Sequence, residues 1–430
     1  MKFSKLRQLI PVSSIGLVVA TLLTACSITT IDYVYVASST GISTLAVDSQ
    51  SGALRSVGDL VTSGASSPVA MVVSHDYANL YVANLGTSSS GGSIVHFAIG
   101  LNGGLTVKET ITLSENPVAL AVDSAGTYLY VASCSSSATS PSLVCSRSGN
   151  LTEYALSSGV IGAVVSKNSL SLSGVSSGYA TDVLVPTGIN VLVNNGTDIK
   201  GNAVYVSGYD LTAYNPGCTV TPPATTCTPS SANPGWVFGF AIGSGGALTA
   251  SQNSPYEAGI KPSAITSDPT DRFVYVTDYA SNDLIGYTIL DGSTLSYLTS
   301  GPFKTGNEPS AIAIDPRGNF IYVNNALDST VSAYAITQAT GNPTGVTNVT
   351  GSSYNSTDTQ PVALVVDPSL GRFVYTANAL GDSVSGFRLN ATSGALSATQ
   401  SSPYPVNKAS KPTAIVAIPH GNHATQVVAP

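Results

Sequence analysis

One phrase recurs along the chain and constrains its fold more than any other feature. It runs from a proline and a small residue through alternating alanine and branched residues to a turn, then to an aromatic residue followed by valine. Copies begin at Pro68, Pro117, Pro186, Pro262, Pro309 and Pro361, the third being degenerate and resuming at Ala203. Counted through to Pro412, the prolines lie 49, 69, 76, 47, 52 and 51 residues apart. Repeats of about 40–50 residues that hold several short strands are typical of propeller blades.

The two ends of the chain carry complementary halves of this phrase. Residues 412–418 (PTAIVAI) contain only its first part, and residues 33–38 (YVYVAS) contain only its second part. Joined, the halves make one blade, and with the six complete copies they predict an all-β, seven-bladed propeller. The C-terminal strand would complete the N-terminal blade, so that no sheet edge remains between the first blade and the last.

Composition agrees with closely packed blades. Charged residues make up 9% of the chain, against about 25% in an average soluble domain. Apolar residues make up 43%, which is enough to build a core. Inner strands buried on both faces should be runs of small and branched residues, and the copies at 118–122 (VALAV) and 362–366 (VALVV) fit this expectation.

The sequence of the repeats resembles that of a known protein family. Residues 275–278 (YVTD), 322–325 (YVNN) and 81–84 (YVAN) are similar to YVTN surface repeats, and nearly all of 33–420 resembles the lactonase-like seven-bladed propellers. That family includes the propeller type of 6-phosphogluconolactonase. The resemblance implies the fold, and it implies lactone hydrolysis only as an expectation, because one fold carries many functions.

The family's histidines are missing from the matching positions. Lactonase-type members often open the inner strand with His-Pro-His, and their Asp-Leu-Gly phrase is reduced here to Asn84-Leu85-Gly86. Lactone hydrolysis needs a base for water and a cation or donors for the oxyanion. The substitutions therefore argue against the usual lactonase site.

The residues before the seven prolines form the alternative candidate site. If all inner strands start at the same end, these residues make one ring at the channel mouth. Its polar members are candidates for binding a small polar or anionic ligand, and Glu308 is a weak candidate for a general base. A solvated rim without a ligand is the simpler interpretation. The candidates are Asn116, Lys261, Glu308, Gln360 and Lys411, and the ring also holds Ser67 and Val185.

The N-terminus has the pattern of an export signal. Lys2, Lys5 and Arg7 precede an apolar run over 15–23, which is too short to span a bilayer and suits the hydrophobic region of a signal peptide. The run ends in residues 23–26 (LTAC), which resemble the lipobox of bacterial lipoproteins. That resemblance implies cleavage before Cys26 and lipidation of its thiol, so that the chain would be anchored to a membrane. A plain secretory signal is the alternative.

The remaining cysteines fit an oxidising compartment. Cys134 and Cys145 are 11 residues apart, Cys218 and Cys227 are 9 apart, and each pair lies in one of the two insertions between repeats. We expect the disulfides Cys134–Cys145 and Cys218–Cys227. A zinc site is the rival interpretation, but the spacing is not CxxC and no histidine is near.

These observations assign the chain a signal peptide at 1–25, an anchored linker at 26–32, the propeller at 33–420 and a tail at 421–430. We expect no cofactor and no metal site. We also expect no nucleic-acid binding, since the formal net charge is −7 and a protein that neutralises phosphates needs clustered Lys and Arg. The expected protein is a monomeric lipoprotein of the periplasm or cell surface. Its expected function is binding of a small polar ligand, a glycan or an envelope protein. A lactone hydrolase with a rearranged site and a structural surface protein are the alternatives.

Overall fold

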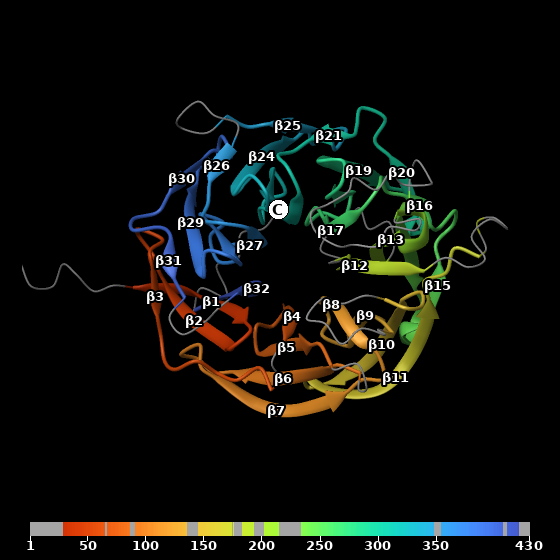
Figure 1. Ribbon diagram of the computed structural model, residues 1–430, viewed down its shortest axis with the longest axis horizontal. Coiled ribbons are helices and arrows are strands. Elements are labelled where there is room, and N and C mark those ends of the chain that lie inside the picture. Colours follow the sequence, from red (N-terminus) through yellow and green to blue (C-terminus); the bar gives the residue numbers. More distant parts are fainter. Residues whose placement is uncertain are drawn as a thin grey trace, which may run out of the picture.

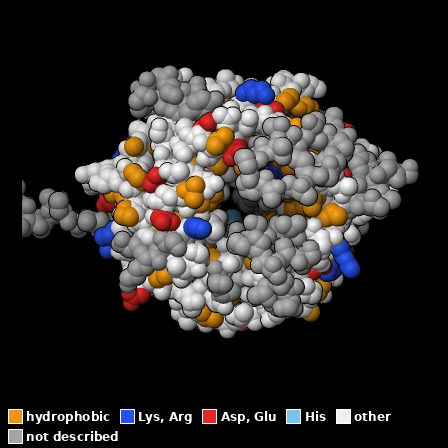
Figure 2. All heavy atoms as spheres, viewed as in Figure 1, with side chains coloured by type: hydrophobic (Ala, Val, Ile, Leu, Met, Phe, Trp, Pro, Cys, Tyr) orange, Lys and Arg blue, Asp and Glu red, His pale blue; other side chains and the backbone are white. Residues whose placement is uncertain are grey.

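The computed structural model describes residues 29–64, 67–86, 91–135, 145–173, 175, 183–192, 202–214, 234–347, 354–406 and 411–420. Seven antiparallel sheets stand around a central axis like the blades of a propeller (Figure 1). Charged side chains are scattered sparsely over the face shown in Figure 2, which is hollowed at the centre of the ring. The predicted all-β, seven-bladed propeller is confirmed. We number the blades 1 to 7 from the blade that begins at Pro68.

The ring closes as the half-repeats predict. The C-terminal strand β32 (Pro412–Pro419) pairs antiparallel with β1 (Thr30–Ser38), in register from Asp32 opposite Pro419 to Ser38 opposite Pro412. Blade 7 therefore combines the two ends of the chain, in the order β3-β2-β1-β32. The strand β1 begins at Thr30, before the expected boundary at Tyr33, and Ile31 is buried in the seam between blades 6 and 7.

The innermost strands explain the recurring proline. A β-bulge follows the proline in every blade, and proline is tolerated there because a bulge or strand start needs no ladder N–H. Each inner strand lies beside the inner strands of both neighbouring blades. These strands are β4 (Pro68–Val73), β8 (Asn116–Val122), β12 (Leu184–Val191), β17 (Pro262–Ser267), β22 (Pro309–Ile314), β27 (Pro361–Val366) and β32.

The second strands carry the recurring aromatic residue, which joins one blade to the next. Seven tyrosines are fully buried here, and six of them donate a hydrogen bond to a backbone carbonyl in a turn of the following blade. For example, the Tyr322 hydroxyl lies 3.0 Å from the carbonyl oxygen of Gly394. We call these contacts tyrosine latches. The strands are β1, β5 (Asn79–Asn84), β9 (Tyr128–Cys134), β13 (Ala203–Asp210), β18 (Phe273–Asp278), β23 (Phe320–Asn325) and β28 (Phe373–Asn378).

The aspartate of the phrase fixes the turn between the first two strands. The Asp315 carboxylate accepts hydrogen bonds from the backbone N–H groups of Asn319 at 2.7 Å and Phe320 at 2.8 Å. Asp268 does the same for Arg272 and Phe273, at 2.8 and 2.6 Å. A short polar side chain thereby starts the second strand at a fixed register.

The outer strands complete each blade. The third strands are β2 (Gly41–Asp48), β6 (Ser93–Ile99), β10 (Asn150–Ser157), β14 (Gly235–Ile242), β19 (Asp283–Ile289), β24 (Thr330–Ile336) and β29 (Ser383–Leu389). The fourth are β3 (Leu54–Ser56), β7 (Leu105–Thr112), β11 (Val160–Ser169), β15 (Leu248–Ala250), β20 (Leu295–Tyr297), β25 (Pro343–Gly345) and β30 (Leu396–Ala398). Blades 3 to 6 add β16 (Tyr256–Glu257), β21 (Phe303–Lys304), β26 (Tyr354–Ser356) and β31 (Tyr404–Pro405).

In the described residues, helix is confined to short turns. One α-helical turn, α2 (Leu211–Tyr214), follows the second strand of blade 3, and the 3-10 turns η2 (Ser244–Gly246) and η3 (Asp291–Ser293) precede fourth strands. In the described part of the chain, no helix is long and apolar enough to cross a membrane.

Candidate functional site at the start of the inner strands

The starts of neighbouring inner strands lie side by side. After three of the seven prolines, the hydroxyl of the next residue donates a hydrogen bond to the proline carbonyl of the following blade. Ser263 reaches Pro309 at 2.5 Å, Ser310 reaches Pro361 at 2.7 Å, and Thr413 reaches Pro68 at 2.8 Å. The residues that precede these prolines therefore lie at one end of the ring, which we call the channel mouth.

Three ring residues share an unusual backbone conformation. Glu308, Gln360 and Lys411 have φ of 55°, 59° and 53°, in the left-handed region that non-glycine residues seldom occupy. The N–H of each donates to a side chain in the preceding blade, namely Asn282 Oδ1 at 2.8 Å, Ser329 Oγ at 3.4 Å and Asp382 Oδ1 at 2.7 Å. Such strain persists only where the surroundings fix it, and it is often found at functional sites.

Lys261 lies at the centre of a tyrosine cluster. Its Nζ is 4.9 Å from the ring centroid of Tyr279, 5.2 Å from that of Tyr214 and 5.5 Å from that of Tyr209. Contacts at this range stabilise a cation over the aromatic face. Burial nevertheless lowers the pKa of Lys261, although the nearby Glu308 carboxylate opposes that shift. We call Lys261, Glu308 and these three tyrosines the mouth cluster.

Glu308 affects the hydroxyl groups of two tyrosines in the cluster. Burial is the main reason that the pKa of Tyr279 is raised, and a hydrogen bond and the negative charge of Glu308 add to it. The pKa of Tyr214 is raised by burial and by the charges of Asp278 and Glu308. The cluster therefore places an ammonium group, a carboxylate and protonated phenols together, a set that can bind a carbonyl, a carboxylate or hydroxyl groups.

Local structure explains how the cluster is assembled. Tyr209 lies near the end of β13 and packs edge-on against Tyr214 of α2, with centroids 5.4 Å apart. Asp210 begins that helical turn by accepting the N–H of Thr212 at 2.8 Å. Asp278 holds the other side, since its carboxylate accepts the N–H groups of Ile260 and Lys261 at 2.6 and 2.9 Å.

The three tyrosines are not among the residues predicted from the sequence, although the sequence contains one signal for them. Tyr209 and Tyr279 each stand four residues after a latch tyrosine, Tyr205 and Tyr275. In the other five blades this position is serine, leucine, cysteine or alanine. A second tyrosine at this spacing therefore distinguishes blades 3 and 4, whose second strands end beside Lys261.

The other predicted ring residues have different surroundings. Asn116 is buried, and its Oδ1 accepts the N–H of Gly86 at 2.7 Å, which joins blade 2 to blade 1. Gln360 is partly exposed and Lys411 is exposed. Lys411 opens blade 7, two blades beyond Glu308, so the structure brings Lys261 and Glu308 together without it.

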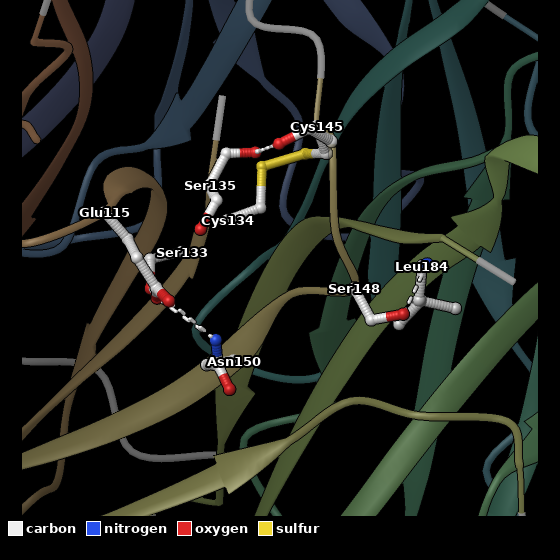
Figure 3. The surroundings of a disulfide bond; sticks show 9 residues. Glu115, Ser133, Cys134, Ser135, Cys145, Ser148, Asn150 and Leu184 are labelled. Atoms are coloured by element: carbon white, nitrogen blue, oxygen red, sulfur yellow. Dashed lines mark hydrogen bonds between the residues drawn. A yellow bond between two sulfur atoms is a disulfide. The ribbon is translucent and has the colours of Figure 1, made fainter. Parts of the chain in front are cut away.

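The first predicted disulfide is present and lies at the same end of the ring. Cys134 and Cys145 are bonded, with their Cα atoms 5.7 Å apart, and Cys134 pairs in register with Asn116. Figure 3 shows the bond next to Glu115, whose carboxylate accepts hydrogen bonds from Ser133 Oγ at 2.8 Å and Asn150 Nδ2 at 3.0 Å. Cys26 and the predicted pair Cys218–Cys227 lie outside the described residues.

The histidines do not form a reactive site in the described residues. His96 is buried in β6, where its Nε2 is 2.8 Å from Asn79 Oδ1 and its Nδ1 is 3.3 Å from Glu109 Oε1. His75 is exposed in a turn. No group of three or more His, Cys, Asp or Glu residues that could hold a metal ion occurs in the segments the structure describes.

Comparisons with known proteins agree with this architecture. The model of a family described as lactonase, 7-bladed beta-propeller, matches residues 25–164, 244–348 and 286–415. Periplasmic gluconolactonase PpgL of Pseudomonas aeruginosa is 18% identical with a TM-score of 0.67, over 91% of this chain and 100% of that one. A proposed 6-phosphogluconolactonase of Bacteroides uniformis is 16% identical with a TM-score of 0.67, over 91% and 100%. A comparison with curated proteins finds no match. The chain belongs to the lactonase family of seven-bladed β-propellers.

Proposed function

We propose that the protein is a binding module of the cell envelope that takes a small acidic or carbonyl-bearing ligand at the mouth cluster. The observation that carries this proposal is the position of the Lys261 ammonium group among three tyrosine rings. Rings that surround an ammonium group hold its position while leaving its N–H donors for a ligand. Sugar acids and their lactones combine the carbonyl or carboxylate with hydroxyl groups that suit Glu308 and the phenols.

Lactone hydrolysis is the second candidate function. It is favoured by one observation, the placement of Glu308 beside both Lys261 and Tyr279. In this mechanism Glu308 would take a proton from water as the water attacks the lactone carbonyl. Lys261 or the Tyr279 hydroxyl would stabilise the oxyanion, and ring opening would release the alkoxide, which gains a proton to give the hydroxy acid.

Binding and hydrolysis are separated by assaying the purified chain and its variants with gluconolactone, its 6-phosphate and gluconate. Lys261→Ala should weaken ligand binding about tenfold or more, because a hydrogen bond to a charged group is lost. Lys411→Ala is the matched control, since it removes an exposed lysine from the same ring. Turnover that Glu308→Gln abolishes would make the protein a lactonase. Binding without turnover supports the module, and neither binding nor turnover would refute both candidates.

We also propose that the chain is anchored by lipid at Cys26. The support is the lipobox pattern in the sequence and the similarity to a periplasmic gluconolactonase. The test is incorporation of a labelled fatty acid in a bacterial host. The label should appear in the unmodified chain and be absent from Cys26→Ser, and label retained in that variant would disprove lipidation at this residue.

A further inference from the structure

A groove between blades 3 and 4 lies outside the mouth cluster. Its volume is about 590 Å³, within the range of about 300–1,000 Å³ that is usual for small-molecule sites. Tyr256 and Glu257 of β16 form its wall in blade 3, and residues of β19 and β20 form its wall in blade 4. Ile285 and Leu295 make part of its lining apolar.

Two tyrosines give the groove an aromatic platform. Tyr287 is 2% exposed, and its hydroxyl donates a hydrogen bond to the carbonyl oxygen of Glu257. Tyr297 is 42% exposed and packs edge-on against it, with centroids 5.8 Å apart and ring planes at 87°. Because the buried ring supports the exposed one, binding on Tyr297 would cost little side-chain entropy.

The carboxylates that line the groove already have partners. Asp278 accepts the backbone N–H groups of Ile260 and Lys261, and Asp283 pairs with Lys304 at 2.9 Å. These charges therefore do not require a cation, and together with Glu257 they disfavour an anion. A carboxylate has about four acceptor sites. The backbone N–H groups of Ile260, Lys261, Ala280 and Ser281 occupy those of Asp278, whereas Asp283 retains capacity for a hydroxyl donor. The chemistry differs from that of the mouth cluster, where the half-buried ammonium group favours an acidic ligand.

We propose that this groove binds an uncharged saccharide. A pyranose ring would lie against the exposed face of Tyr297, because its C–H groups complement the negative face of an aromatic ring. Its hydroxyl groups would donate to the carboxylates of Asp283 and Glu257. The groove lining contains none of the five mouth-cluster residues, although Asp278 borders both, and the proposal does not depend on the function proposed at the cluster.

The test is titration calorimetry of the full chain with maltotriose, cellotriose and chitotriose, in a detergent that has no sugar headgroup. We expect at least one trisaccharide to bind. Tyr297→Ala should weaken that binding about tenfold or more, while Tyr297→Phe should stay within about threefold, since the ring supplies the stacking surface. Leu290→Ala is the matched control, because Leu290 is 45% exposed in the same blade and does not line the groove.

Several results would overturn the proposal. If none of the three sugars binds, an uncharged saccharide is excluded as the ligand. Saccharide binding that Tyr297→Ala leaves unchanged would exclude it from this groove. Binding of tetralysine in their place, weakened by Tyr297→Ala, would assign the groove to a basic peptide. Lys261→Ala should leave saccharide binding intact, and loss of saccharide binding in that variant would place the sugar at the mouth cluster.

Discussion

Blades 4 to 6 are near-copies of one another, whereas blades 1 to 3 depart from the same plan in several places. Opposite the latch tyrosine, the regular blades have Gly286, Ala333 and Gly386 in the third strand. Blades 1 and 2 have His96 and Glu153 at this position. The departures also include the Cys134–Cys145 disulfide and the two long intervals between repeats.

The irregular blades show which features of the regular blades the closed ring can lack. All three regular blades combine a small residue opposite the tyrosine with a latch, but blade 1 keeps its latch opposite His96, so the small residue is not required. In blade 2 the Tyr130 hydroxyl lacks a carbonyl partner and lies beside the Glu153 carboxyl. The fold therefore survives a missing latch, and the mouth cluster forms where blade 3 of the irregular sector meets blade 4 of the regular one.

Deleting residues 411–430 should have the largest effect on stability, because it affects both the regular blades 4 to 6 and the irregular blades 1 to 3. Loss of β32 leaves β1 as an open edge and exposes the apolar seams on both sides of blade 7. We expect the cooperative unfolding transition to disappear in urea, followed by fluorescence. Deleting only 421–430 is the control and should retain the transition. A truncated chain that unfolds as sharply as the full chain would show that the seam does not hold the ring closed.

Removing the disulfide should destabilise the irregular sector next most strongly. Cys134→Ser with Cys145→Ser opens a loop of 11 residues' separation, which costs about 3 kcal/mol if loop entropy dominates. The buried sulfur atoms pack against Val185, so we expect local loosening in blades 2 and 3 as well. Hydrogen exchange should increase in β9 and β12 but not in β23 or β28. Equal increases in both sectors would contradict the comparison.

The fold could be predicted from the sequence because each blade repeats the same residues at the same spacing. The proline, the aspartate and the tyrosine of the phrase each have a local role, so their spacing alone gave the blade number and the closure. The mouth cluster was only half predicted. Lys261 and Glu308 follow from the repeat, but Tyr209, Tyr214 and Tyr279 meet them through contacts between blades and through the short α2 turn, neither of which strand periodicity encodes.

A single latch should contribute less than the disulfide. Tyr322→Phe removes the buried hydroxyl bonded to the Gly394 carbonyl, so the free energy of unfolding should fall by about 1 kcal/mol. Tyr130→Phe is the matched change in the irregular sector, and it removes no hydroxyl bound to a carbonyl. The free energy of unfolding, measured from urea midpoints, should fall less for Tyr130→Phe than for Tyr322→Phe. Equal losses would mean that the latch hydrogen bond adds nothing to the packing of the ring.

The smallest effect, and the one that depends on pH, should come from Glu153. Its side chain is buried against Tyr130 and Ser166 with Asp123 nearby, and burial raises its pKa from the usual 4.5. A raised native pKa means that stability is highest below the unfolded-state value and declines as pH rises through the native value. The Glu153→Gln variant should therefore gain stability relative to the unmodified chain as pH increases from about 4.5.

Taking the difference in stability between the two proteins cancels the contribution of other buried carboxyls, such as Asp32. Asp59→Asn, at an exposed position, is the control. Parallel pH profiles for Glu153→Gln and the unmodified chain would show that folding does not raise the pKa of Glu153, and would contradict the prediction.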